Sequence, residues 1–178
     1  MKIEWKTVPK YIINISDLNM AYEICHRFRS WNIKHYVYMI KYHGLVIKYG
    51  HSVDEKSEPG NRLYRQIGHC EVWDNDPFYK KINGDSGSEW RIIEDRFHRL
   101  YGTKMMKDRM TVEVYDFTNY KFKSIKPIDE VKYAEQFLIS TYNNITGDNP
   151  IGNIQHDKNY DRKAHVAADT FHQNFDFN

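Results

Sequence analysis

The most informative element of the sequence is His35–Gly50, HYVYMIKYHGLVIKYG. Two runs rich in aromatic and β-branched residues flank a break at Gly44, a pattern typical of a β-hairpin. A three-residue loop, Tyr42–Gly44, with Gly44 in the left-handed conformation, would place Tyr38 opposite Lys48 with their Cβ atoms roughly 5 Å apart. Because an ammonium beside a phenol favours the phenolate, this pair is a candidate proton acceptor. Taken alone, a Tyr–Lys pair is also common between neighbouring strands of a half-exposed sheet, where it has no catalytic role.

The residues before the hairpin form an N-terminal extension, 1–35. Polar and apolar residues alternate over Lys2–Val8, which predicts a strand, and Tyr11–Ile15 is a second apolar run. Ser16 is a candidate N-cap for a helix that ends near Trp31 and Asn32. The helix is indicated by an apolar stripe at three- and four-residue spacing: Leu18, Ala21, Tyr22, Cys25 and Phe28.

The residues after the hairpin predict three helices and one strand. Asn61 can cap a short helix, 62–67, that Gly68 closes. An insertion at about 69–109 is irregular at first and then predicts a helix from Ser88, with an apolar stripe of Trp90, Ile93, Phe97 and Leu100. A strand over 110–117 and a helix over 128–143 follow, and the tail, 154–178, has few large apolar residues.

Composition limits the class of protein. The chain has 178 residues, 40% hydrophobic and 28% charged, which is ordinary for one globular domain with additions. The net charge of +2 excludes a strong nonspecific polycation, and no apolar run approaches the roughly 18–20 residues of a membrane span. The first residues do not form a signal peptide, so we expect a cytoplasmic protein without a membrane partner. Cys25 and Cys70 are therefore expected to be reduced thiols.

Glu135 lies within an apolar helical pattern. One interpretation places it on the buried stripe Ile128, Val131, Glu135, Leu138 and Tyr142, where a carboxylate needs an arginine or a metal ion. In the other, the stripe is Val131, Ala134, Leu138 and Thr141, and Glu135 lies at its edge in water. The sequence leaves both open.

Several basic residues are candidates for binding a phosphate group. Arg62 begins the short helix after the hairpin, where a guanidinium and free backbone N–H groups would both favour an anion, and Arg65 shares nearly the same face. Lys121 and Lys123 flank Phe122 in a second basic stretch. For each of these residues, an ordinary solvated surface position is the alternative.

Taken in order, these motifs resemble the GIY-YIG nuclease superfamily. The matching elements are Tyr36-Val37-Tyr38, then Lys48-Tyr49-Gly50-His51-Ser52, Arg62-Leu63, Glu135–Ile139 and Asn149–Asn153. The resemblance implies an α+β fold with a small, mainly antiparallel three-stranded sheet flanked by helices over residues 36–153.

This chain departs from the family pattern at three positions. Tyr36 stands where the family has its first glycine, and Lys48 replaces the first tyrosine of YIG, as in some restriction endonucleases of the superfamily. Gln66 replaces a histidine or tyrosine often found four residues after the arginine. His51, close by in the hairpin, is the candidate substitute for that contact.

The resemblance also implies roles for individual residues. Tyr38 is similar to the general base or water-positioning tyrosine, Lys48 to its activating partner, and Arg62 to the phosphate-binding arginine. Glu135 resembles the single metal ligand, for Mg²⁺ or in its place Mn²⁺. Asn153 resembles the closing asparagine, which we expect to pin the loop after the helix by hydrogen bonds, with DNA contact secondary.

The expected function is metal-dependent, sequence-specific cleavage of double-stranded DNA by a compact type II restriction enzyme. Since one active site nicks one strand, cutting a symmetric site suggests a homodimer. A phage-type or repair nuclease of the same superfamily is the first alternative. A noncatalytic nucleic-acid-binding module of the same fold is the second.

Overall fold

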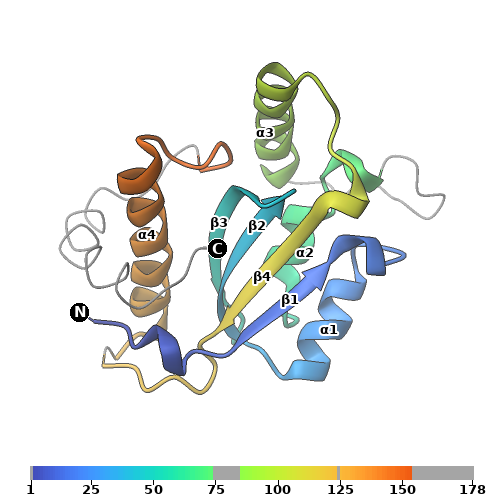
Figure 1. Cartoon of the computed structure of the whole chain (residues 1–178). Coiled ribbons are helices and arrows are strands. Elements are labelled where there is room, and N and C mark those ends of the chain that lie inside the picture. Colours follow the sequence, from blue (N-terminus) through green and yellow to red (C-terminus); the bar gives the residue numbers. More distant parts are fainter. Residues whose placement is uncertain (1, 74–84, 124, 154–178) are drawn as a thin grey trace.

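The protein has an α+β architecture built on one antiparallel sheet (Figure 1). The computed structural model describes residues 2–73, 85–123 and 125–153. Among these residues, four strands pair in the order β1-β4-β2-β3. The strands are β1 (Lys10–Asn14), β2 (His35–Tyr42), β3 (Leu45–Val53) and β4 (Met110–Asp116). The α-helices are α1 (Glu23–Trp31), α2 (Asn61–Ile67), α3 (Asp85–Tyr101) and α4 (Pro127–Thr146).

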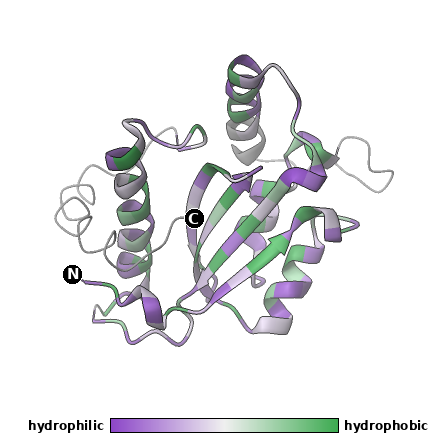
Figure 2. Ribbon diagram, in the orientation of Figure 1, coloured by the Kyte–Doolittle hydropathy of each residue, from purple (hydrophilic) through white to green (hydrophobic). Residues whose placement is uncertain are grey.

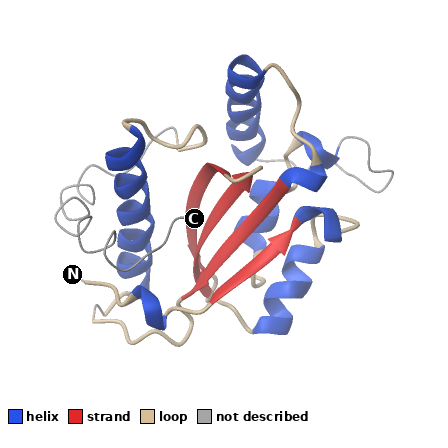
Figure 3. Cartoon of the chain, viewed as in Figure 1, coloured by secondary structure: helices blue, strands red, loops and turns tan. Residues whose placement is uncertain are grey.

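Helices cover both faces of the sheet (Figure 3). On one face, α1, α2 and α3 pack against even-numbered β2 residues, including Tyr36, Tyr38 and Ile40. On the other face, α4 packs against Val37 and Met39. Alternating hydrophobic and hydrophilic residues along β4 are visible in Figure 2, as expected for a strand that uses its two faces differently.

The hairpin is confirmed, but the predicted register is wrong. The turn is two residues, His43 and Gly44, with φ of 49° and 82°, so both have the positive φ of a type I′ turn. A bulge then leaves Ile47 as an extra residue, because Lys41 pairs with Val46 whereas Ile40 pairs with Lys48. Tyr38 therefore opposes Gly50 rather than Lys48. Since the register error is two residues, Tyr38 and Lys48 still lie on the same face of the sheet.

The N-terminal extension belongs to the sheet, which corrects the expected three strands to four. Its strand is β1, which overlaps the second apolar run, while the first run contains only a 3₁₀ turn, Trp5–Thr7. Ile3, Trp5 and Val8 are buried all the same, with Trp5 edge-on to Tyr115. Helix α1 begins at Glu23 rather than after Ser16, and it ends as predicted, with Asn32 in the left-handed conformation.

The other elements agree closely with the sequence. Helix α2 is present, although Gly60 rather than Asn61 occupies the N-cap position. Helix α3 begins three residues before Ser88, and Leu100, expected to be buried, is 62% exposed. Most of the expected irregular part of the insertion, 74–84, and the whole tail, 154–178, lie outside the described residues. In the described ranges no helix is long and apolar enough to cross a membrane.

Candidate active site

The candidate site is a cavity of about 650 Å³ at the free edge of β3. Six of the predicted site residues line it, although they come from four different elements and the segment after α4: Tyr38, Lys48, His51, Arg62, Glu135 and Asn153. Because β3 is the last strand of the sheet, a cavity at its edge can be reached from both faces. Tyr38 and Lys48 belong to the face of α2, and His51 belongs to the face of α4.

Tyr38 reaches the cavity by lying across Gly50. The two residues are paired in the register, and a Cβ added to Gly50 would overlap the outer atoms of the Tyr38 ring. Glycine at this position therefore lets the ring cross the neighbouring strand. Tyr38 is 1% exposed, so the ring is fixed by packing as well as by the strand.

Lys48 and Asn153 connect β3 to the segment that follows α4. The Lys48 ammonium donates to the carbonyl of Gly152 at 3.3 Å. The Asn153 side chain forms two bonds to the backbone of Tyr49: its Oδ1 accepts from the N–H at 2.9 Å, and its Nδ2 donates to the carbonyl at 3.1 Å. The N–H of Gly152 also donates to the carbonyl of Ile47 at 2.8 Å. Asn153 thus makes hydrogen bonds of the kind expected for a residue that pins the loop after α4, and these bonds cap part of the edge of β3.

Glu135 lies at the margin of the buried stripe of α4. Val131, Ala134, Leu138 and Thr141 are fully buried, as in the second interpretation. The Glu135 side chain is nevertheless only 12% exposed, because it faces the cavity rather than open water. Its Oε2 lies 2.5 Å from Nδ1 of His51, which donates when the carboxylate is ionised. In that arrangement a neutral His51 carries its lone pair on Nε2.

Arg62 brings a guanidinium from α2 to the cavity. It follows Gly60, the N-cap of α2, by two residues and is exposed. Arg65 is also exposed but is not among the residues that line the cavity. The structure thus places Arg62, and not Arg65, among the residues that line the cavity. Gln66 is fully buried and does not line the cavity, whereas His51 does.

Lys121 and Lys123 lie elsewhere. They line a second cavity of about 490 Å³ together with Lys2, Glu4 and Asp116. This cavity contains no residue of the first one. The two lysines therefore do not belong to the first cavity, and a role in binding a phosphate backbone would be a separate one.

The sequence did not reveal some of the lining residues. Ser52, Ile92, Ile128 and Gly152 also line the cavity. The alternation of β3 could have indicated Ser52, which follows Lys48 and Gly50 on the same face. Ile92 comes from the insertion, and nothing in its local pattern distinguishes it from a surface residue.

The donor set at Glu135 fits a hydrated hard cation. The bond to His51 uses only Oε2. Within the described ranges, no cluster of three or more His, Cys, Asp or Glu side chains could hold a metal ion. Mg²⁺ commonly takes one or two carboxylates and keeps several waters, so a single carboxylate facing a roomy cavity suits it. A tightly enclosed zinc site would need more protein ligands.

Comparisons with protein-family models, curated proteins and solved structures found no significant match for this chain. A function for the protein therefore has to be inferred from the side chains themselves and from the order of the motifs.

Proposed function

We propose that this protein is a metal-dependent endonuclease that hydrolyses phosphodiester bonds of double-stranded DNA, acting as a type II restriction enzyme. The observation that carries the proposal is the meeting of five polar or charged side chains in one cavity, although they are up to 97 positions apart in the sequence, from Tyr38 to Glu135. A phenol, an amine, an imidazole, a guanidinium and a carboxylate supply the groups that phosphodiester hydrolysis requires.

Each side chain has a role that suits its position. Tyr38, with Lys48 on the same face, would position the attacking water and accept its proton. Arg62, from α2, would bind the phosphoryl oxygens with its planar fork. His51 would orient the carboxylate of Glu135, which it contacts directly.

Glu135 would hold one Mg²⁺ together with water molecules, and Mn²⁺ would substitute for it. When bound, the cation neutralises charge on the departing oxygen. Lys121, Lys123 and Arg65 would contact the DNA backbone away from the scissile phosphate. Cutting both strands at once would require two copies of the site, which a twofold homodimer supplies.

The decisive experiment compares wild type with Glu135→Ala on supercoiled plasmid in Mg²⁺. We expect discrete linear fragments from wild type and a loss of about 100-fold or more in the variant, because its one carboxylate ligand is gone. Asp129→Ala is the matched control, since Asp129 is an exposed carboxylate in the first turn of the same helix and does not line the cavity. Equal cutting by wild type and Glu135→Ala would remove Glu135 from the site.

The pattern of products separates the proposal from its alternatives. Sharp fragments indicate a restriction enzyme, whereas smears or cleavage confined to branched or damaged DNA indicate a repair or phage-type nuclease. Binding that persists in EDTA, without cutting in any divalent metal, indicates a noncatalytic module.

A further inference from the structure

One loop, 54–60, connects the cavity residues of β3 to Arg62 on α2. Strand β3, which carries Lys48 and His51, ends at Val53, and α2, which carries Arg62, begins at Asn61. The conformation of this loop therefore sets where Arg62 stands relative to the strand. A guanidinium must be placed to within a fraction of an ångström to bind a reacting phosphate productively.

Asp54 holds both ends of the loop together. It is 5% exposed, and its carboxylate accepts hydrogen bonds from the Ser52 hydroxyl at 2.6 Å, the Gly60 N–H at 2.9 Å and the Ser57 hydroxyl at 3.3 Å. Ser52 lines the cavity, and Gly60 is the N-cap of α2. One buried side chain thus bonds to a cavity residue of β3 and to the start of the helix that carries Arg62.

The backbone of Asp54 anchors the same point to the rest of the fold. Its N–H donates to the carbonyl of Lys34 at 2.7 Å, just before β2. Burying a carboxylate is costly unless it is fully hydrogen-bonded, and bonds to a charged acceptor are among the strong ones. The hydrogen bonds of the Asp54 carboxylate therefore hold the loop more strongly than those of a neutral side chain would.

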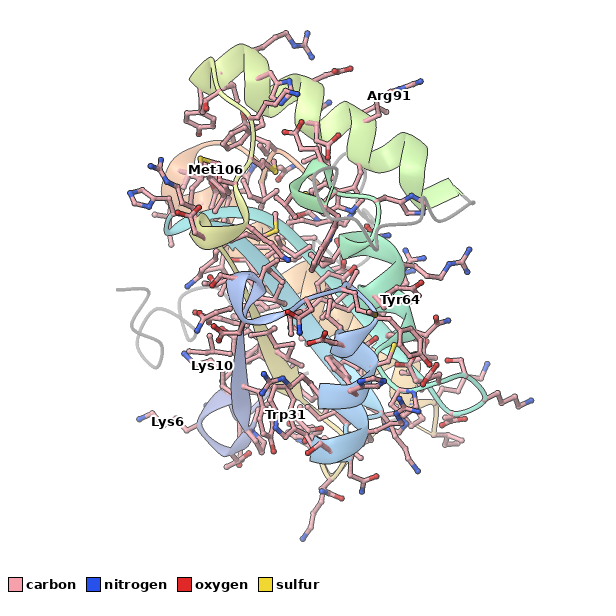
Figure 4. All side chains as sticks on the ribbon, turned by 90° about the vertical axis from the view of Figure 1, so that its right-hand side faces the viewer. Lys6, Lys10, Trp31, Tyr64, Arg91 and Met106 are labelled. Carbon is pink, nitrogen blue, oxygen red and sulfur yellow. The ribbon has the colours of Figure 1, made fainter. Side chains whose placement is uncertain are left out.

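Helix α1 braces the other side of the loop. Gly60 has a φ of 78°, and a Cβ there would press on the ring of Phe28. Glu58 accepts from the Tyr22 hydroxyl at 2.8 and 2.7 Å and pairs with Arg29 at 3.1 Å. Figure 4 shows α1 and α2 on the same side of the sheet, with Trp31 and Tyr64 labelled on that side. The loop is consequently clamped between Asp54 and α1.

We infer that Asp54 is a positioning residue, which acts on the substrate phosphate only through the placement of Arg62. This inference rests on the proposed function, because it assumes that Arg62 binds a phosphate. Without the carboxylate, the Gly60 N–H and the Ser52 hydroxyl lose their partner, and the start of α2 is free to shift. Arg62, two residues farther on, shifts with it.

The test is a double-mutant cycle between Asp54→Ala and Arg62→Ala. The readouts are the Kd of a fluorescent DNA duplex in EDTA and the rate of plasmid cleavage in Mg²⁺. We expect each single variant to bind about tenfold more weakly, the order expected for one lost charge-assisted contact. The double variant should bind no more weakly than Arg62→Ala alone, because the two residues act as a unit. Asp54→Asn keeps one acceptor oxygen and should recover part of the binding.

Glu113 supplies the matched control, because it is a second buried carboxylate and does not line the cavity. It is 9% exposed and pairs with Lys41 at 2.7 Å and Lys10 at 3.6 Å. Glu113→Ala should lower thermal stability, but its effect on binding should be independent of Arg62→Ala. If Asp54→Ala is unfolded at the assay temperature by circular dichroism, Asp54→Asn takes its place in the cycle.

The coupling energies separate the possible results. Coupling to Arg62 by Asp54 but not by Glu113 supports the inference. Independent effects of Asp54 and Arg62, or equal coupling by Glu113, overturn it while leaving the proposed function intact. A wild-type protein that neither binds nor cuts DNA overturns the proposed function and this inference with it.

Discussion

The ring of Tyr38 lies against the backbone of Gly50, its register partner, with no room for a side chain between them. This contact explains how a fully buried strand residue can reach a cavity at the sheet edge. The phenol crosses the neighbouring strand at the one position where that strand has no Cβ. Gly50 is therefore needed for the space it leaves, since its φ is not in the left-handed region.

Gly50→Ala should displace the Tyr38 ring and reduce cleavage by about 10- to 100-fold, because a small misplacement of a catalytic group has effects of that size. Overpacking should also cost about 1–3 kcal/mol of stability. Plasmid cleavage and thermal denaturation measure the two effects.

Gly44→Ala is the control in the same hairpin: its φ of 82° makes alanine strained, but no atom lies within 4 Å of the added Cβ. It should lose stability without losing specific activity, and an equal loss in both glycine variants would contradict the steric explanation.

Asn153→Ala should release the segment that closes the cavity. Two bonds to the Tyr49 backbone disappear, and the contact of Lys48 with the Gly152 carbonyl loses its support. We expect a stability loss of about 1–3 kcal/mol, since buried backbone groups lose partners, together with faster hydrogen exchange at the Tyr49 amide. Asn143→Ala removes a bond to Asn149 outside the cavity and should leave that exchange rate unchanged. Unchanged Tyr49 protection in Asn153→Ala would rule out the pinning role.

The paired substitution Lys121→Ala and Lys123→Ala should weaken DNA binding without altering the sequence that is cut. Each phosphate contact removed should reduce the slope of log K against log salt by about 0.9. Binding titrations at several salt concentrations measure that slope. Lys104→Ala, an exposed lysine that lines neither cavity, serves as the control. A slope that does not change would exclude the second cavity from the DNA interface.

Both cysteine thiols should be unreactive in the native protein. Cys25 and Cys70 have no exposed surface, and burial raises the pKa of Cys25 to about 12. Because the thiolate is the reactive form and a raised pKa lowers its fraction at pH 8, alkylation should be slow until the protein unfolds. Labelling with a thiol reagent across a urea titration should follow the unfolding transition monitored by circular dichroism. Rapid labelling of either thiol without urea would show that the surrounding core opens locally.

Local patterns predicted the elements better than they predicted the pairing. The alternation of β2 and β3 and the apolar stripe of α4 identified those elements, because burial on one face imposes a period on the sequence. The register failed because it depends on the turn and the bulge. His43 adopts a positive φ, which is uncommon for a residue other than glycine, and Ile47 is an extra residue that no pattern distinguishes from a paired one.

The site could be predicted in composition but not in geometry. The motif order indicated Tyr38, Lys48, Arg62 and Glu135, and all four line one cavity. The contact between His51 and Glu135 depends on how α4 packs against β3. The bond between Asp54 and Gly60 depends on the fold of loop 54–60, which brings its last residue back to its first. Such contacts come from tertiary packing, which a one-dimensional period does not record.

The hydrogen bonds from Gly152 and Asn153 to β3 also affect how a shortened chain would aggregate. Gly152 and Asn153 occupy hydrogen-bonding groups of Ile47 and Tyr49 at an outer strand. A truncated protein that stopped at residue 149 would leave those groups open to pairing with a strand of another molecule. We expect such a fragment to aggregate through this unprotected strand edge during expression.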